Sequence, residues 1–443
     1  MPKITIIGAG TMAFVRALVA DITTYPELEG ATICLMDINP DRLEMSRKLA
    51  QRILIQQHSR CVIETTLDRR EALTGADYVL TTFQIGGLDV VEKDIYIPAK
   101  YGVSQCVGDT MGPGGIFRGL RTIPVLLDVA KDIEEICPDA ILLQYCNPMA
   151  VNMWALSEAF PHIKMAGLCH SIQGTSRLMA SWIGAPYEEI TFRAAGINHM
   201  AWFVDFKWNG KDAYPLLWEA LKDPVKIGKD PVRIELAHHV GVFMTESSGH
   251  LSEYLPWFRN TEANINRLVE RFTDPGADWL DWGRTGGYLR HCIHDLETAP
   301  ERRRRWIEGE VPVPVERSVE YGPAIVAALE ANQSFVFYGN VLNTGLISNL
   351  PQGACVEVPV VVDRHGFRPT HFGKLPPHLA ALNTTNILVQ ELVVRASQTG
   401  DKTLLRNAVA LDPIVSSNCN LEQAEAITRE MLEANARWLP QFA

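Results

Sequence analysis

The stretch that decides the fold is Lys3-Ile-Thr-Ile-Ile-Gly8-Ala9-Gly10-Thr11-Met12-Ala13. Its first five residues form a short run rich in β-branched residues with no polar face, which predicts a strand buried on both faces of a parallel sheet. The residues from Thr11 to Ala20 then have a helical pattern. The stretch therefore predicts a strand, a glycine-rich turn and a helix in immediate succession.

The turn matches the GxGxx(G/A) pattern that binds dinucleotides. Gly8 permits the tight turn, Gly10 lets the backbone approach a pyrophosphate, and the small Ala13 lets the helix lie close to the strand. The free N–H groups of the helix N-terminus attract the phosphates. Asp37, at the end of the second strand, is expected to bind the ribose 2′-hydroxyl of NAD. The alternatives are a strand–helix turn without a ligand and, for Asp37, capping of a helix that begins near Asp41.

Apolar runs alternate with helical segments through the first half of the chain, which predicts βαβ units and a doubly wound sheet. The further expected strands are 31–36, 76–83, 140–146 and 163–168, with a helix over 120–136 in which Pro124 marks a start or a kink. Ligands bind at the carboxyl ends of such strands. The residues expected at that edge are Gly8 to Gly10, Asp37, Gln84 to Gly87, Asn147, Cys169 and His170, with Gln84 and Gly86 at the cofactor.

The regular alternation of predicted strands and helices stops after about residue 195. A strand over 203–208 leads into Asn209-Gly210, a hairpin signal, and another strand is expected over 354–362. The last hundred residues have helical patterns. We therefore predict an α/β protein with a Rossmann-type NAD-binding domain at 1–195 and a C-terminal α+β catalytic and oligomerisation domain at 196–443.

Composition excludes several classes of function. The formal net charge is -11, from 41 basic and 52 acidic residues, which does not favour nucleic acid or an anionic membrane as a partner. No apolar stretch reaches the ~18 residues that a membrane-spanning helix needs. The nine cysteines are scattered singly and the start of the chain lacks the pattern of a signal peptide, so a cytoplasmic location is expected.

Cys169 and His199 are the candidate metal ligands. A thiolate and an imidazole suit a borderline transition metal, and two protein ligands would leave positions open for substrate oxygens. From the pattern alone, Cys169 as a buried small hydrophobe and His199 as a satisfied core histidine remain open alternatives.

Several segments, in one order along the chain, resemble glycoside hydrolase family 4. They are Phe83 to Gly87, Gly112 to Ile116, Asn147 to Ala150, Gly167 to Ser171, Ala195 to Ala201, Thr245 to Ser248, Glu253 to Phe258 and Asn349 to Gly353. Within the family, the chain is most similar to enzymes that act on unphosphorylated α-galactosides. Family members are exceptions to the two-carboxylate rule of glycosidases, because they depend on NAD.

The resemblance implies an unusual mechanism. NAD⁺ takes the C3 hydride of the sugar, and a metal, usually Mn²⁺, polarises the resulting ketone as a Lewis acid. A base then removes the acidified C2 proton and the leaving group departs from C1. Water adds to the enone, and NADH returns the hydride.

By the same resemblance, Cys169 and His199 are metal ligands, Asn147 binds the C2 and C3 hydroxyls, and Tyr254 is the C2 base. A phenol of pKa ~10 needs a nearby cation to act as a base. The alternative for Tyr254 is packing on Trp257.

The resemblance leaves more than one candidate for the general acid, the group that protonates the leaving group. Phosphosugar-cleaving relatives have Asp after the metal-binding Cys, whereas this chain has His170, which favours an unphosphorylated sugar. His170 is expected to protonate the leaving group. Alternatively it binds a sugar hydroxyl while Asp109 or water donates the proton. Asp109 is expected to bind sugar hydroxyls, with helix capping as its alternative.

Rival functions remain at this stage. They are an α-glucosidase or α-galacturonidase of the same family, an NAD-dependent 2-hydroxy acid dehydrogenase, and a dinucleotide-binding sensor. The family resemblance also implies a homodimer or homotetramer.

Overall fold

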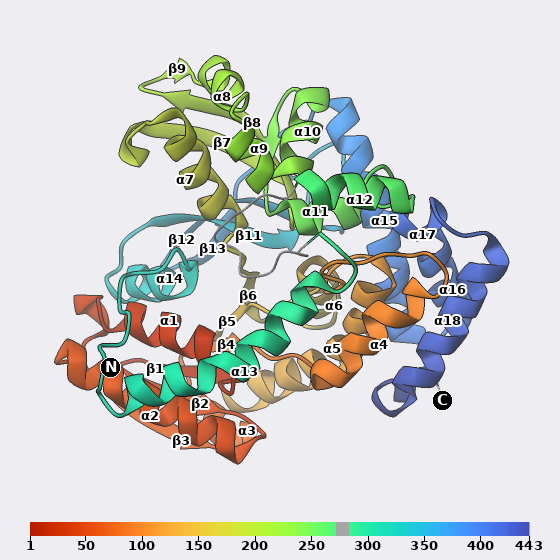
Figure 1. Cartoon of the computed structure of the whole chain (residues 1–443). Helices are drawn as coiled ribbons and strands as arrows, with labels where there is room; N and C mark the ends of the chain where they lie inside the picture. Colours follow the sequence, from red (N-terminus) through yellow and green to blue (C-terminus); the bar gives the residue numbers. More distant parts are fainter. Residues whose placement is uncertain (272–282, 443) are drawn as a thin grey trace.

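The computed structural model describes residues 1–271 and 283–442, and the first six strands form a parallel sheet (Figure 1). Their spatial order is β3-β2-β1-β4-β5-β6, which is the order of a dinucleotide-binding doubly wound sheet. The predicted α/β fold with a Rossmann-type sheet is therefore confirmed. The strands are β1 (Lys3–Ile7), β2 (Thr32–Met36), β3 (Val62–Thr66), β4 (Tyr78–Thr81), β5 (Ile141–Gln144) and β6 (Lys164–Gly167).

Helices connect these strands and cover the sheet. The edge strand β3 was not predicted, because its residues are mostly exposed and carry no buried apolar pattern. The helices of this half are α1 (Met12–Ile22), α2 (Pro40–Gln57), α3 (Arg69–Leu73), α4 (Gly87–Ala99), α5 (Gly112–Ile136), α6 (Met149–Ala159) and α7 (Ser171–Ile183).

Helix α5 begins eight residues before the predicted start at 120, and Pro124 lies inside it rather than at its beginning. Its first turn is rich in glycine, which has a low helix propensity and therefore concealed the start. The glycines are needed for close packing. A Cβ on Gly115 would lie 2.3 Å from the carbonyl carbon of Thr110, so the loop before α5 rests directly on its first turn.

The strands after residue 190 extend the same sheet. β11 pairs with β6 and β12 pairs with β7, each through one antiparallel residue pair. The hairpin predicted at Asn209-Gly210 is confirmed, because both residues have positive φ and join β8 to β9. The added strands are β7 (Ile190–Ile197), β8 (Met200–Trp208), β9 (Lys211–Asp212), β10 (Phe243–Met244), β11 (Phe335–Leu342), β12 (Cys355–Asp363) and β13 (Gly366–Pro369).

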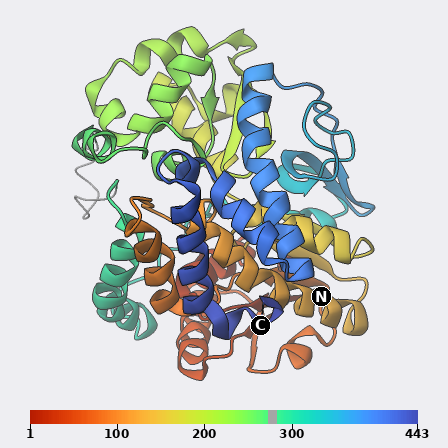
Figure 2. The same ribbon diagram turned by 90° about the vertical axis from the view of Figure 1, so that its right-hand side faces the viewer.

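The predicted domain boundary at residue 195 falls inside β7, and the domain division stays a prediction. The helices beyond it are α8 (Tyr214–Ala220), α9 (Pro224–Lys229), α10 (Pro231–Val240), α11 (Ser248–Tyr254), α12 (Glu262–Arg271), α13 (Gly287–Ile307), α14 (Tyr321–Glu330), α15 (Pro377–Thr399), α16 (Lys402–Leu411), α17 (Pro413–Ser416) and α18 (Leu421–Asn435). The last helices lie side by side in blue on the face shown in Figure 2. No helix in the described ranges is both long and apolar enough to cross a membrane.

One continuous row of paired residues crosses nine strands and marks the functional edge of the sheet. The row is Met36, Ile7, Thr81, Gln144, Gly167, Asn340, Glu357, Gly196 and Ala201. The glycine loop and Asp37 follow the row at one end, and Cys169 and His199 lie close to it at the other. The predicted alignment of these strand ends along one edge is confirmed.

Candidate functional site

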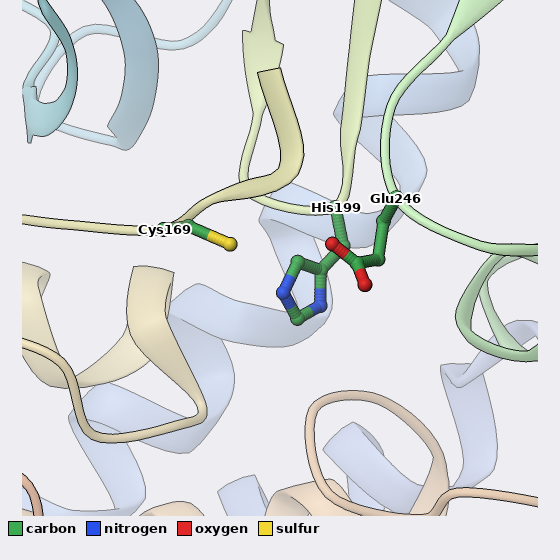
Figure 3. A group of neighbouring side chains, drawn as sticks. All are labelled: Cys169, His199 and Glu246. Carbon is green, nitrogen blue, oxygen red and sulfur yellow. The ribbon is translucent and has the colours of Figure 1, made fainter. Parts of the chain in front are cut away.

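Cys169, His199 and Glu246 form a compact group of metal-ligating side chains. One potential ligand atom from each lies within 4.8 Å of the other two. In Figure 3 the imidazole of His199 lies between the sulfur of Cys169 and the carboxylate of Glu246. A sulfur, a nitrogen and an oxygen donor that converge in this way suit a transition metal better than Mg²⁺ or Ca²⁺, which prefer oxygen ligands throughout. The residues of this group, called the metal trio below, therefore fit a divalent metal.

Turns between strands and helices hold the trio. Cys169 follows β6, His199 occupies the turn between β7 and β8, and Glu246 follows β10. His199 has φ 64° and Glu246 has φ 88°, both in the left-handed region that non-glycine residues rarely adopt. Backbone strain of this kind gathers at functional sites, where the surrounding structure has to enforce it.

Burial sets the direction of the pKa shifts of His199 and Cys169, whereas the histidines around Glu246 lower the pKa of its carboxyl despite burial. Burial lowers the pKa of His199 to about 4, so the imidazole is neutral and able to ligate. Burial raises the pKa of Cys169, and the neighbouring Glu246 raises it further. A cation held by the trio would reverse the effect on the thiol of Cys169, because a coordinating thiol is deprotonated.

Asp109 is the hub of a polar network beside the trio. Its Oδ1 accepts a hydrogen bond from the Thr110 hydroxyl at 2.6 Å, and its Oδ2 accepts one from Asn147 Nδ2 at 3.1 Å. Burial would raise the pKa of Asp109, but the charges of His250 and Arg118 outweigh burial and hold it below its usual range. The two predicted substrate-binding residues, Asp109 and Asn147, are therefore in direct contact.

His250 completes the network and was not predicted. Its ring packs edge-to-face on that of His199, with centroids 4.4 Å apart, and its Nε2 lies 3.3 Å from Asp109 Oδ1. Burial lowers the pKa of His250, but Asp109 outweighs burial and raises it to about 9. His250 is thus a buried cation that faces both Asp109 and the trio.

Tyr254 lies one helical turn after His250 on α11 and is only 1% exposed. Its hydroxyl donates a hydrogen bond to the carbonyl of Asn198 at 3.1 Å, and its ring centroid is 6.5 Å from that of His199. Burial raises the pKa of Tyr254, and the negative charge of Asp109 adds to the rise. Among the described residues the ring paired with that of Tyr254 is His199, and Trp257 is 51% exposed.

His170 lies beside the trio but at the surface of the site, with its side chain 53% exposed. Its Nδ1 lies 3.2 Å from Glu320 Oε1, and this contact raises the pKa of His170 to about 9. The ring is therefore protonated at neutral pH and open to solvent. The structure places His170 next to Cys169, as the sequence requires, and adds Glu320 as a partner that no sequence pattern indicated.

The glycine loop closes on the end of β2. Gly8 has φ 93°, and a Cβ there would lie 2.7 Å from that of Phe83. Asp37 Oδ2 accepts a hydrogen bond from the Gly10 N–H at 2.7 Å, and Asp37 Oδ1 accepts one from the Asn39 N–H at 2.9 Å. Asn39, not Asp37, caps α2, so the capping alternative for Asp37 is wrong.

The packing argument for Ala13 is also wrong. Ala13 is exposed, whereas Ala9 in the preceding loop and Met12, the first residue of α1, are buried. The helical period therefore turns Ala13 outward, where it lines a small cavity with Trp306 of α13. The third position of the motif does not limit how closely helix and strand approach in this chain.

The other two predicted cofactor residues lie at the end of β4. Gln84 Nε2 donates hydrogen bonds to the carbonyls of Ile85 and Gly87 at 3.0 and 3.3 Å. Gly86 has φ 97° and precedes α4, and a Cβ there would lie 2.6 Å from Val90. Both residues lie at the edge of the sheet that carries the glycine loop.

Sequence reasoning missed Glu246, His250, Thr110 and Arg118. Arg118 Nε donates to the carbonyl of Asn147 at 3.2 Å, and its Nη1 lies 4.0 Å from Asp109 Oδ2. Glu246 and the His250–Tyr254 spacing of four residues lie in or between segments that carry the family resemblance. No spacing rule links those segments to Cys169 or His199, so the convergence required the tertiary structure.

The sequence profile of the "Family 4 glycosyl hydrolase" matches residues 3–185, and that of the family's C-terminal domain matches residues 194–415. Curated α-galactosidases from Rhizobium meliloti (strain 1021) and Bacillus subtilis (strain 168) are each 40% identical to the chain. Both alignments cover 100% of this chain, and they cover 90% and 100% of the respective relatives. An α-galacturonidase from Lachnoclostridium phytofermentans is 30% identical, with coverage of 99% of the chain and 97% of the relative.

Solved structures show the same fold. The crystal structure of lplD from Bacillus subtilis superposes with a TM-score of 0.86 at 28% identity, covering 98% of this chain and all of that one. A 6-phospho-α-glucosidase from gut microorganisms, solved in complex with NAD and Mn²⁺, superposes with a TM-score of 0.82 over 99% of both chains. The second pair is 19% identical, so that likeness concerns the fold alone.

Proposed function

The chain belongs to family 4 of the glycosyl hydrolases, and we propose that it hydrolyses α-galactosides with the help of NAD and a divalent metal such as Mn²⁺. The observation that carries the proposal is the row across the sheet, which ends in a dinucleotide-type loop on one side and a metal trio on the other. A simple hydrolase needs no such pairing. An enzyme that oxidises its sugar substrate and later reduces it again needs a dinucleotide site and a metal site at the same edge of the sheet.

The cofactors are proposed from the donors present. The glycine loop and the start of α1 would hold NAD, with Asp37, Gln84 and Gly86 nearby, and the trio would hold the metal with Glu246 as a third ligand. When bound, NAD supplies a hydride acceptor and the metal supplies a Lewis acid for sugar oxygens. Both amide atoms of the buried Asn198, the neighbour of His199, lack a hydrogen-bond partner in the described structure, which supports a polar ligand here.

The chain's own residues would divide the remaining work. Asn147, held by Asp109 and Arg118, is proposed to orient the C2 and C3 hydroxyls. Tyr254 is proposed as the base for the C2 proton. Because burial raises its pKa, its phenol can work only beside positive charge, and the neighbouring trio is where a cation would be held.

His170 is proposed to protonate the leaving group. It is half-exposed and therefore accessible to an aglycone, and its pKa of about 9 keeps it protonated at neutral pH. Glu320 would hold the ring in place during the transfer. Asp109, whose carboxylate is occupied by protein donors, is not suited to donate a proton.

The α-galactoside substrate is supported by sequence similarity. The two α-galactosidases are 40% identical across the whole chain, against 30% for the α-galacturonidase. An α-galacturonide or α-glucoside substrate would leave the proposed chemistry unchanged, because these sugars differ from galactosides only away from C1, C2 and C3 or in the configuration of one hydroxyl.

The test is hydrolysis of p-nitrophenyl α-galactoside, α-glucoside and α-galacturonide by thiol-reduced protein, with and without NAD⁺ and Mn²⁺. We expect the galactoside to be cleaved only when both cofactors are present, without net formation of NADH. Preference for another sugar would correct the substrate. Cleavage without NAD⁺, or NADH production from a 2-hydroxy acid without glycoside cleavage, would overturn the proposal.

We also propose a cytoplasmic homodimer or homotetramer. All nine cysteines lie in the described residues and are free, which suits a reducing compartment. Exposed leucines at 388, 411 and 421 on the C-terminal helices offer apolar surface to a second copy. Light scattering of the purified protein tests the assembly, and a monomer at micromolar concentration would contradict it.

A further inference from the structure

A chain of two hydrogen bonds runs from Asp109 through Thr110 to His199. The Thr110 hydroxyl lies 2.6 Å from Asp109 Oδ1 and 3.4 Å from His199 Nδ1. All three side chains are buried, with exposed fractions of 8%, 4% and 3% from Asp109 to His199. The contact joins the loop before α5 to the turn between β7 and β8, two segments about ninety residues apart in sequence.

The direction of these hydrogen bonds follows from the number of protons. Thr110 has a single hydroxyl proton, and a carboxylate can only accept. The short contact to Asp109 therefore uses that proton, and the Thr110 oxygen is left as an acceptor. His199 Nδ1 must then carry a hydrogen and donate it to Thr110, which leaves Nε2 with a free lone pair.

We propose that Thr110 is a positioning residue that holds His199 in the Nδ1–H tautomer and thereby presents the Nε2 lone pair to the metal. The proposal rests on the metal trio of the proposed function. A histidine that ligates a metal commonly donates its other N–H to a carboxylate or carbonyl, and this partner sets the tautomer and the orientation of the ring. Here a threonine stands between the imidazole and the carboxylate.

The surrounding contacts hold Thr110 where this role requires it. The Glu253 carboxylate accepts hydrogen bonds from the N–H groups of Val107 and Gly108, at 2.7 and 3.0 Å. Asp412 accepts one from the Gly112 N–H at 2.9 Å. Together with the close packing of Gly115 on Thr110, these bonds fasten the loop at both ends. Thr110 therefore cannot follow the imidazole if the ring turns, and the ring must align with Thr110.

The same geometry gives Asp109 a different role from the predicted one. Its two oxygens face Thr110, Asn147 and His250, all of them side chains of the protein. A carboxylate with this many internal partners organises its neighbours rather than binding a sugar directly. Asp109 thus links the amide that is proposed to orient the substrate with the imidazole that is proposed to ligate the metal.

The test compares Thr110→Val, which keeps the shape but removes the hydroxyl, with Thr110→Ser, which restores it. Calorimetric titration of metal-free protein with Mn²⁺ measures affinity without any turnover. We expect Thr110→Val to weaken Mn²⁺ binding by about 10- to 100-fold, the usual loss for an outer-shell partner, and Thr110→Ser to recover most of it. Melting temperatures of the metal-free variants separate this effect from a loss of folding.

A second readout tests the proposal on the wild-type protein itself. ¹⁵N spectra of metal-free protein labelled at histidine report the tautomer, with His199 assigned by the signals that disappear in His199→Gln. We expect a protonated Nδ1 and an unprotonated Nε2 in the wild type, and a mixture or the reverse in Thr110→Val. A wild-type His199 protonated at Nε2 would overturn the proposal even if Thr110→Val failed to fold.

The outcomes also separate this proposal from the proposed function. Wild-type protein that binds no Mn²⁺ would refute the metal centre, and the tautomer proposal would fall with it. Tight Mn²⁺ binding that Thr110→Val leaves unchanged, with an unchanged tautomer, would refute the role of Thr110 alone.

Discussion

The two ends of the row across the sheet, which are proposed to bind NAD and the metal, are built from different parts of the chain. At the dinucleotide end, the N–H groups of the glycine loop donate to the Met36 carbonyl and to Asp37, which holds the loop in shape, and its side chains are small or absent. At the metal end, the trio and Asp109 offer side chains, and the backbone serves to aim them. Positive φ occurs at both ends, at Gly8 on one side and at His199 and Glu246 on the other.

This difference predicts which kind of substitution is most damaging at each end. Positive φ carries no steric penalty for glycine, whereas it costs a residue with a Cβ roughly 1–2 kcal/mol. The dinucleotide end is therefore vulnerable to added atoms. The metal end already contains that strain and is vulnerable to lost functional groups. The predictions below, from the largest expected effect to the smallest, test this contrast.

Removal of a ligand should be most damaging at the metal end. We expect Cys169→Ser to lower kcat/KM by roughly a thousandfold or more, because the metal stabilises charge that only develops during the reaction. The affinity for NAD⁺, measured by fluorescence titration, should stay within about threefold of wild type. Cys419→Ser, in which another partly buried thiol is changed far along the chain, is the matched control. A large loss of NAD⁺ affinity in Cys169→Ser would show that the two ends are not independent.

Loss of the proposed base, Tyr254, should leave the binding of NAD⁺ and Mn²⁺ unchanged. We expect Tyr254→Phe to reduce kcat by about 10²- to 10⁴-fold, the range for removal of a general acid or base. Its dissociation constants for NAD⁺ and Mn²⁺ should stay close to wild type, because the lost hydroxyl donates its hydrogen bond to the Asn198 carbonyl and not to a proposed ligand residue. Steady-state kinetics and the two titrations measure this. Activity within fivefold of wild type would exclude Tyr254 as the base.

Removal of the proposed acid, His170, should slow hydrolysis strongly only when the substrate has a poor leaving group. We expect His170→Gln to slow hydrolysis of a galactosyl disaccharide by about a hundredfold, whereas p-nitrophenyl α-galactoside, whose leaving group needs little protonation, should be slowed by no more than about fivefold. His250→Gln is the comparison, since His250 is also a protonated histidine beside the trio. If His250→Gln, rather than His170→Gln, shows the dependence on the leaving group, the acid is His250.

An added methyl group should be most damaging at the dinucleotide end. A Cβ on Gly10 would lie 2.7 Å from Asp37 Oδ2, so Gly10→Ala has to displace the carboxylate that the loop holds. We expect NAD⁺ binding to weaken by roughly 10- to 100-fold, given the 1–3 kcal/mol typical of overpacking, with Mn²⁺ affinity unchanged. Gly174→Ala, where the added atom meets open space, should leave both affinities unchanged. Unaltered NAD⁺ affinity in Gly10→Ala would mean that the loop does not bind the cofactor.

The parallel sheet and its first loop could be predicted because their signals are local. β1 was predicted with its observed bounds, and Asp37 follows β2 as expected, since a buried parallel strand appears in the sequence as an unbroken apolar run. The errors came from local rules that tertiary contacts override. The start of α5 was hidden by glycines that are needed for its contact with Thr110, and Ala13 turned out to face outward.

Only some residues of the candidate site could be predicted from the sequence. Cys169 and His199 could be named because their segments resemble those of a family, and Asn147 and Tyr254 for the same reason. Glu246 lies in such a segment and His250 lies between two of them, but neither carries a pattern that assigns it a partner. Their positions beside His199 depend on the pairing of β10 with β8 and on the first turn of α11.

The amino-acid sequence by itself determined the class of fold, the position of the dinucleotide-type loop and the family of the enzyme, because strands, turns and motifs depend on neighbouring residues. Only the tertiary structure decided that Glu246 joins Cys169 and His199, that Asp109 is occupied by Thr110, Asn147 and His250, and that both ends of the site share one row. Side chains from turns far apart in the chain meet through strand register and loop packing, and these are properties of the whole sheet rather than of any segment.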